Sequence, residues 1–180
     1  ITELPVGNWE GRGGAKVGDE LIMAKDLLSE VMRHKMEIIE EFPGSDLVGK
    51  AYHPIFPGAI DRGDSETAWT IVGADFVTTT DGTGIVHTAV MYGEDDYSLG
   101  MDVGFPAQHT VGMDGKFIQG THNQLDGQYV KDCDSKIIDL LSNDNQLYRE
   151  HIYTHDYPHC WRTDHPLLYY AMDSWFVRMT

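Results

Sequence analysis

A histidine and two adjacent carboxylates follow a glycine-rich turn in the middle of the sequence. Residues 81–89 read Asp-Gly-Thr-Gly-Ile-Val-His-Thr-Ala, and Asp95 and Asp96 come shortly afterwards. Glycine lets backbone amides approach a ligand closely, because it adds no side chain. A histidine and a carboxylate that converge beyond the end of a strand can form a polar binding or catalytic site. A tight hairpin with an exposed acidic turn fits the same residues, so both interpretations stay open.

A second group of chemically active side chains surrounds Cys160. Its histidines are His151, His155, His159 and His165, with Asp156 and Asp164 between them. Histidines four residues apart on a helix can bind one metal ion together, but Tyr157-Pro158 interrupts any helix here. The third residue after Cys160 is Thr163, so the Cys-x-x-Cys pair of a structural zinc site is missing. We therefore predict no metal site and keep a histidine-rich metal-binding domain as a lesser alternative.

Nucleophilic catalysis has little support in the sequence. His159 precedes Cys160 directly, and adjacent residues of a strand point to opposite faces, so this histidine is badly placed to serve as the base. A buried structural role is expected for Cys160. Neither a Gly-x-Ser-x-Gly elbow nor a Walker A loop occurs. The hydroxyls of Thr78, Thr79 and Thr80 are interpreted as those of ordinary strand residues.

The elements that must position these side chains are helices and short strands. Apolar residues recur with helical spacing up to Phe42, which predicts a helix that starts at Asp26 and stops before Pro43. A second helix is predicted from Asp134 to Ser142. Runs rich in β-branched and aromatic residues predict strands over 20–24, 69–72, 75–78 and 84–88. The order of elements favours an α+β domain with a barrel-like or strongly twisted sheet and helices packed outside it.

Length and charge limit the function further. The 180 residues include 13 Lys+Arg and 29 Asp+Glu, a net charge of −16, and their number suits one domain. A surface this acidic disfavours wrapping DNA or long RNA, although a cleft can still admit a nucleic-acid end. No apolar run approaches the roughly 18 residues of a membrane span, and no signal peptide is visible. Two cysteines argue against a disulfide-stapled secreted scaffold. These features predict a soluble, cytoplasmic domain without a membrane partner.

The C-terminal residues are unusually apolar. Trp175, Phe176 and Val177 all lie within the last six residues. The termini of complete domains are usually polar and frayed. We therefore expect the chain to be a fragment of a longer protein.

Three stretches resemble the editing domain, or CP1 insertion, of isoleucyl-tRNA synthetases, which are class I aminoacyl-tRNA synthetases. Residues 157–162, Tyr-Pro-His-Cys-Trp-Arg, resemble the segment by which that domain returns to the catalytic core. Residues 81–97 resemble its Asp-Gly-Thr-Gly-x-Val-His-x-Ala and Gly-x-x-Asp-Tyr/Phe motif, and residues 42–49 a third stretch. The resemblance implies that residues 1–180 form one excised editing domain with a β-barrel-like core and flanking helices. Residues 1–18 would be a loop that leads into it, and residues 157–180 the return segment.

The resemblance also implies an activity, namely hydrolysis of tRNA(Ile) that is mischarged with valine. A synthetic site that accepts isoleucine cannot strongly reject valine, because one methylene is worth only about 1–3 kcal/mol. A second site that admits valine and excludes isoleucine by size supplies the missing discrimination. The resemblance implies attack of a positioned water on the aminoacyl ester, without a covalent enzyme intermediate.

Site residues follow from the resemblance by position. Asp96 would anchor the α-ammonium group of the substrate, and His87 would line the amino-acid pocket and help to exclude isoleucine. Thr83 and Gly84 would form the pocket wall. Thr88 and Gly93 complete the implied substrate-binding set.

The implied partners are the 3′ end of tRNA(Ile), valine as the aminoacyl group, and the catalytic core of the same synthetase. No cofactor is expected for the domain, whereas the full-length enzyme uses ATP and Mg²⁺. DNA is not an expected partner, and the domain is expected to be monomeric. Residues 1–20 lack the family's threonine-rich strand, and this departure supports an alternative, a catalytically incomplete module that only binds the tRNA 3′ end. A second departure concerns the loop that carries Asp96, since Val90 stands where the family has proline after His-x-Ala.

Overall fold

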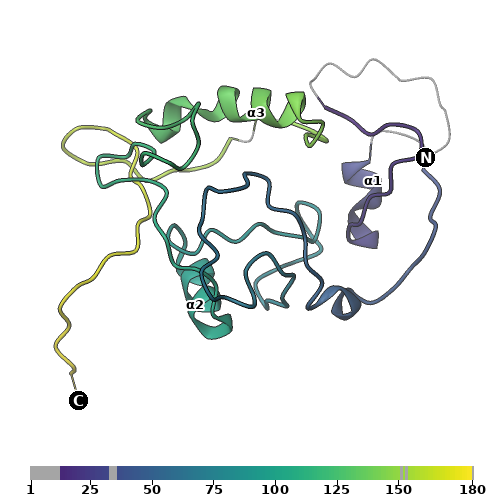
Figure 1. Ribbon diagram of the computed structural model, residues 1–180, viewed down its shortest axis with the longest axis horizontal. Coiled ribbons are helices and arrows are strands. Elements are labelled where there is room, and N and C mark those ends of the chain that lie inside the picture. The colour runs from purple at the N-terminus through teal and green to yellow at the C-terminus, as the bar shows by residue number, and fades with distance from the viewer. Residues whose placement is uncertain (1–12, 33–35, 151, 153, 180) are drawn as a thin grey trace.

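Short helices joined by long irregular segments make up the fold (Figure 1). The computed structural model of the chain describes residues 13–32, 36–150, 152 and 154–179. Its helical segments in chain order are η1 (Lys25–Leu27), α1 (Leu28–Val31), η2 (Gly44–Leu47), α2 (Glu94–Val103), η3 (Val130–Asp132) and α3 (Asp134–Asn143). None of the helices in the described ranges is long and apolar enough to cross a membrane.

The predicted β-barrel-like core is wrong. Within the described ranges the chain contains no strand and no sheet, and antiparallel pairing is limited to isolated bridges. These bridges join Ala51 to Thr70, Val111 to Phe117, Lys116 to Tyr129, and His159 to Pro166. The predicted α+β fold class is therefore wrong, because the helices are present and the sheet is not.

Backbone geometry explains why the strand-like runs do not form strands. Trp69 has a φ of 58° and Gly84 a φ of 75°, so each takes the left-handed conformation where an extended run was expected. The amide of Val77 donates to the carbonyl of Ala74, which closes a turn inside the run over 75–78. β-Branched residues favour extended backbone, but a strand also needs a continuous partner, and here pairing stops after one or two residues.

The long helix predicted from Asp26 to Phe42 is also wrong. Among the described residues of this range, helical structure is confined to η1 and α1, and the backbone of Met32 is already extended, with φ −77° and ψ 130°. Leu27 and Val31 are buried, whereas Ile38 and Ile39 are 52% and 70% exposed. An amphipathic segment gains most of its helical stability by packing its apolar face, and the second half of this one packs little.

The second predicted helix is confirmed as α3. Its apolar side chains, among them Ile137 and Leu141, are half-buried, whereas Asp139 is exposed. The N-cap residue is Cys133 rather than the predicted Asp134, and no side chain caps this end. Cys133 is 1% exposed, and its thiol donates to the Tyr129 carbonyl beneath the helix.

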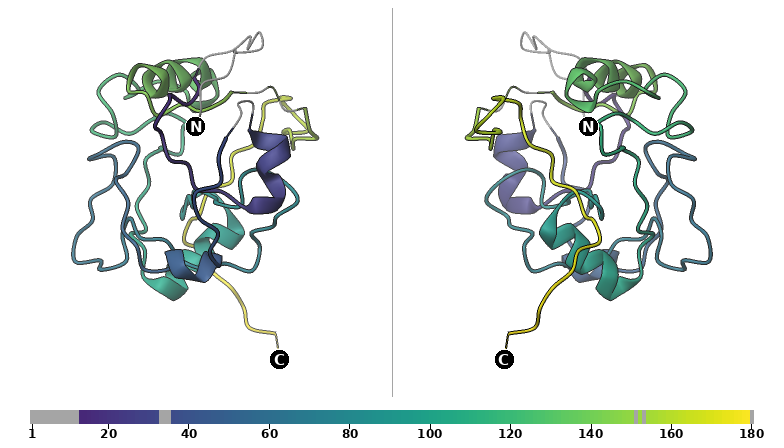
Figure 2. Two further views of the ribbon diagram at one scale, coloured as in Figure 1. Left: turned by 90° about the vertical axis from the view of Figure 1, so that its right-hand side faces the viewer. Right: turned by 90° about the vertical axis from the view of Figure 1, so that its left-hand side faces the viewer.

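The buried core is small and is drawn from many segments. Its apolar members are Leu27, Val31, Leu47, Ala68, Val111, Leu125 and Cys133. The C-terminal segment runs away from the helices and ends beyond the body of the molecule (Figures 1 and 2). Along it Trp175, Phe176 and Val177 are almost fully exposed. The fold thus places α2 near the middle of the chain between irregular segments, and these hold it in position.

Candidate functional site

The acidic run after His87 forms the start of helix α2 rather than a turn. Gly93 is the N-cap residue, and its carbonyl accepts the amide of Tyr97 at 2.8 Å. Glu94, Asp95 and Asp96 occupy the first helical turn. Carboxylates at this end interact favourably with the partial positive charge of the helix dipole. The helix therefore accounts for the acidic cluster and gives Asp96 a defined place.

Asp96 differs from its two acidic neighbours because its carboxylate lies over Gly93. A Cβ atom on Gly93 would lie 2.5 Å from the Asp96 Oδ2 atom, so a side chain at this position would displace the carboxylate from its place over the N-cap. Asp96 is half-buried, whereas Glu94 and Asp95 are exposed. Of the three carboxylates, that of Asp96 is held against the backbone and still reaches solvent.

The Gly-Thr-Gly turn is fixed to the segment that precedes η1. The Ala24 amide donates to the Thr83 carbonyl at 2.8 Å. A Cβ on Gly84 would lie 2.5 Å from the Ala24 Cβ, so glycine is required for this approach. The Thr83 hydroxyl is used locally, since it donates to the Ile85 carbonyl at 3.0 Å. Thr83 and Gly84 are therefore packed directly against Ala24.

The loop between the turn and α2 packs back on the helix. A Cβ on Gly100 would lie 2.7 and 2.8 Å from the two methyl groups of Val90. The Tyr92 amide donates to the Ala89 carbonyl at 2.8 Å and closes a turn just before Gly93. Val90, which replaces the proline of the resembling motif, thus makes a direct contact with α2.

The structure pairs the predicted site residues in part. Asp96 and Gly93 touch, and Thr83 and Gly84 share the turn against Ala24. The side chain of His87 is exposed, and Thr88 is half-buried in the connecting loop. Among the described residues, no hydrogen bond or ion pair joins His87 or the Gly-Thr-Gly turn to Asp96. The Gly-Thr-Gly turn and the start of α2 are thus each held by their own contacts, and residues 85–92 connect them.

The histidine-rich stretch does not assemble a metal site within the described ranges, where no group of three or more metal-binding side chains occurs. The ring Nδ1 atoms of His155, His159 and His165 lie 2.9–3.0 Å from backbone carbonyl oxygens next to them in the chain. His151 lies outside the described residues.

The prediction that Cys160 is a buried structural cysteine is wrong, because Cys160 is half-exposed and Cys133 is the buried one. Cys160 lies in a hairpin, where its amide donates to the His165 carbonyl at 2.8 Å. A hydrogen bond with the Thr163 side chain, followed by the backbone amides of Arg162 and Thr163, lowers the pKa of the Cys160 thiol. The His159 ring contacts the Tyr157 carbonyl instead of this thiol, so no catalytic pair forms.

The threonine run over 78–80 lies in an exposed bend rather than in a strand. The hydroxyls of Thr78 and Thr80 are 3.0 Å apart and bond each other. These side chains are exposed and stand at the edge of the Gly-Thr-Gly turn along the chain. The interpretation as strand residues is therefore wrong.

The helix α2 itself is the feature that sequence reasoning missed. The signal that could have found it is the run Gly-Glu-Asp-Asp at 93–96, because acidic residues favour the first turn of a helix and glycine is an acceptable N-cap.

Comparison with known proteins places the chain among aminoacyl-tRNA ligases. No protein-family model matches it. The isoleucine–tRNA ligase of Clostridium novyi (strain NT) is 45% identical over 163 residues, 91% of this chain. That of Clostridium tetani (strain Massachusetts / E88) is 46% identical over 166 residues, 92% of this chain. That of Bacillus thuringiensis (strain Al Hakam) is 39% identical over 163 residues.

The match covers a small part of each relative. The chain spans 15–16% of the length of these curated relatives. Over the 163–166 aligned residues, the chain is similar to one segment of the isoleucine–tRNA ligases.

Proposed function

We propose that the chain is the editing domain of an isoleucine–tRNA ligase and hydrolyses valine from mischarged tRNA(Ile). The observation that carries the proposal is the carboxylate of Asp96, held over Gly93 at the start of α2 and still open to solvent. The similarity to isoleucine–tRNA ligases over 163 residues supports the choice of substrate. Isoleucine and valine differ by one methylene, which a single binding site distinguishes poorly.

Asp96 has the chemistry that an aminoacyl ester requires. Its negative charge suits the α-ammonium group of valine, and a charge-assisted hydrogen bond would hold the substrate in one orientation. Water then attacks the ester carbonyl carbon, and the bond to the ribose oxygen of the tRNA breaks. The proton of the water passes to that oxygen, and the products are free valine and tRNA. This hydrolysis needs no cofactor; ATP and Mg²⁺ would serve only the charging reaction of the whole ligase.

The other predicted residues shape the pocket in this proposal. Thr83 and Gly84, which pack against Ala24, would form the pocket wall. Thr88 and Gly93 would complete the substrate-binding set. His87 is exposed in the connecting loop, where a ligand can contact its ring. We assign it the exclusion of the larger isoleucine side chain.

The proposed partners are the 3′ end of tRNA(Ile) and the rest of the same ligase. The C-terminal segment presents exposed apolar side chains, including those of Trp175 and Phe176. Apolar surface of this kind is characteristic of a buried contact with protein. In the proposal this segment returns to the remainder of the ligase.

Replacement of Asp96 by alanine tests the proposal. The variant should lose about 10- to 100-fold in kcat/KM for deacylation of Val-tRNA(Ile), because a hydrogen bond to a charged group is worth about 1.5–3 kcal/mol. Asp95→Ala is the matched control, since Asp95 is the adjacent and exposed carboxylate of the same helical turn. It should retain the activity of the original chain.

Two other outcomes would change the assignment. Full activity of Asp96→Ala would remove Asp96 from the site. Binding of a non-hydrolysable valyl-adenosine analogue without turnover of Val-tRNA(Ile) would favour the module that only binds the tRNA end. This second function is supported by one observation: residues 1–20 contain no match to the threonine-rich strand.

A further inference from the structure

The start of helix α2 is attached to two distant parts of the chain through Tyr92. The hydroxyl oxygen of Tyr92 accepts the backbone amide of Thr110 at 2.7 Å and that of Val111 at 2.8 Å. A tyrosine hydroxyl has two acceptor lone pairs, so these two bonds use its full capacity as an acceptor. Val111 is buried, so loss of the oxygen would leave an amide of the core without its partner.

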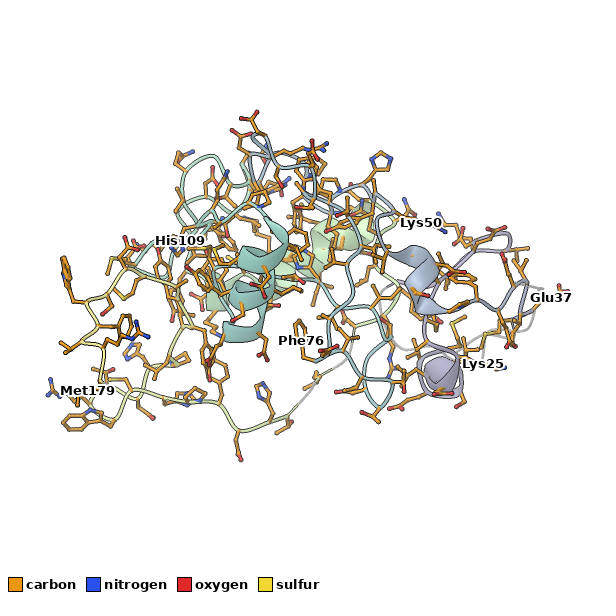
Figure 3. The ribbon with its side chains drawn as sticks, turned by 90° about the horizontal axis from the view of Figure 1, so that it is seen from below. Lys25, Glu37, Lys50, Phe76, His109 and Met179 are labelled. Carbon is orange, nitrogen blue, oxygen red and sulfur yellow. The ribbon has the colours of Figure 1, made fainter. Side chains whose placement is uncertain are left out.

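The ring of Tyr92 makes a second attachment, to the C-terminal segment. Tyr92 contacts the edges of His109 and Tyr170, with ring centroids 5.8 and 6.0 Å away. His109 and Tyr170 stack on each other at 4.1 Å with an angle of 8° between their planes. Figure 3 shows His109 on the side of the molecule toward Met179, opposite Lys25 and Glu37. The three rings thus join the loop before α2 to the base of the C-terminal segment.

A backbone bond reinforces the same junction. The Ala171 amide donates to the Met91 carbonyl at 2.9 Å, one residue before Tyr92. The C-terminal segment is therefore bonded to the loop before α2 by main chain as well as by side chains. Beyond this point its side chains, such as Met172, are mostly exposed.

Only a short and well-ordered path separates Tyr92 from Asp96. Tyr92 directly precedes Gly93, which caps α2 and accepts the first helical bond from Tyr97. The Asp96 carboxylate lies against Gly93. A displacement of Tyr92 must therefore move the N-cap and, with it, the direction in which this carboxylate points.

We propose that Tyr92 is a positioning residue that sets the orientation of Asp96 and makes it depend on docking of the C-terminal segment. The proposal rests on the proposed editing function, because Asp96 is taken there as the anchor of the aminoacyl group. Tyr92 touches no substrate in this scheme. It acts by holding the start of α2 between residues 109–111 and residues 170–171.

The test uses Tyr92→Phe, which removes the hydroxyl and keeps the ring. Tyr157→Phe is the matched control, because the Tyr157 hydroxyl donates to the Leu167 carbonyl at 2.7 Å and has no contact with α2. Hydrogen exchange should become at least about tenfold faster at the amides of Val111 and Tyr97 in Tyr92→Phe, and should stay unchanged in Tyr157→Phe.

Kinetics supply the second measurement. For Val-tRNA(Ile), Tyr92→Phe should raise KM by about three- to tenfold with a smaller change in kcat, because the anchoring carboxylate is misdirected. In an Asp96→Ala background the same change should have no further effect, since Tyr92 acts through Asp96. An equal additional loss in that background would overturn the proposal.

Amide hydrogen exchange at Tyr97 tests the positioning role of Tyr92 independently of the proposed editing activity. If the unmodified chain deacylates nothing, the editing function fails, and exchange at Tyr97 in Tyr92→Phe still decides whether Tyr92 orders the helix start. Unchanged exchange there would overturn the positioning role.

Should Tyr92→Phe fail to fold, Tyr170→Leu, which removes only the stacked ring of the C-terminal segment, should give the same pattern with a smaller amplitude. Exchange at Tyr97 that stays unchanged in Tyr170→Leu would contradict the coupling to that segment.

Discussion

The close contact between the Gly-Thr-Gly turn and Ala24 depends on a single glycine. Gly84 combines a left-handed backbone with a contact in which an added Cβ would lie 2.5 Å from Ala24. Gly82, two residues earlier, is also left-handed, but nothing lies within 4 Å of its missing Cβ. Gly82 is therefore favoured by its backbone conformation alone, whereas Gly84 is favoured both by its backbone conformation and by the lack of space for a side chain.

This difference predicts the stabilities of two alanine variants. Gly82→Ala should cost about 1–2 kcal/mol, the usual penalty of a left-handed residue with a side chain. Gly84→Ala should cost about 1–3 kcal/mol more, because Ala24 must move as well. Urea denaturation of both variants measures the difference. Equal losses would show that the contact between residues 24 and 84 contributes nothing to stability.

A carboxylate with a shifted pKa is not always part of a site, as Asp126 shows. Backbone amides of His122 and Gly120 donate to this side chain at 2.8 and 2.7 Å and lower its pKa. These bonds close the loop over residues 119–126, far along the chain from α2. Asp126 is accordingly interpreted as a structural residue, because its carboxylate is bonded by the backbone amides of its own loop.

At the scale of elements, α2 is held by a contact that the sequence alone does not reveal. Gly100 lies in the middle of the helix, where alanine would normally be the more stable residue by about 1 kcal/mol. Here the Cβ of alanine would meet the methyl groups of Val90 at 2.7–2.8 Å. Valine is stiff about its first side-chain torsion and cannot easily move aside.

We therefore expect Gly100→Ala to destabilise the chain by about 1–2 kcal/mol, despite its better helix propensity. In a Val90→Ala background the same substitution should be neutral or stabilising, because the colliding methyl groups are gone. Thermal unfolding of the two single variants and the double variant gives the interaction energy. A loss that persists without the valine methyl groups would assign the effect to another cause.

Local pattern predicts some elements of this chain and not others. Ile137, Ile138 and Leu141 repeat with helical spacing, and α3 follows them closely. In α2 the apolar residues Tyr97, Leu99, Met101 and Val103 alternate, as they would in a strand, so the periodicity conceals the helix.

Other failures have causes outside the local pattern. The expected helix up to Phe42 fails because the apolar side chains of Ile38 and Ile39 in its second half are largely exposed. The expected strands fail because backbone pairing stops after one or two residues. At the site, residue types identified Asp96, His87 and the Gly-Thr-Gly turn as candidates. The supports at Ala24 and Tyr170 come from distant segments, so no local pattern predicts them.

At the scale of the whole molecule, the charge of −16 determines how the chain meets a nucleic acid. Only 13 basic residues oppose 29 acidic ones, so long stretches of phosphate backbone are repelled. A single-stranded end places few phosphates on the protein. The charge is therefore compatible with the proposed editing of an aminoacylated end, in which the tRNA body would be bound outside this chain.

Salt dependence checks this prediction. The chain should bind uncharged tRNA(Ile) no more tightly than about 10⁻⁶–10⁻⁴ M, the range of non-specific contacts. From 50 to 200 mM salt we expect a loss of less than about tenfold, against about 10³–10⁵ for proteins with many phosphate contacts. Fluorescence anisotropy with whole tRNA and with an oligonucleotide of its 3′ end should give similar affinities. Much tighter binding of whole tRNA would contradict the prediction.

The unequal exposure of the two cysteines offers a way to observe the C-terminal region directly. Cys133 is sealed beneath α3, whereas Cys160 is half-exposed, with hydrogen bonds that favour its thiolate. A maleimide dye would consequently attach at one place, next to the exposed indole of Trp161, on which the Arg162 guanidinium rests at 4.5 Å. Quenching of the dye by that indole would report when the remainder of a ligase covers this hairpin, without any engineered label.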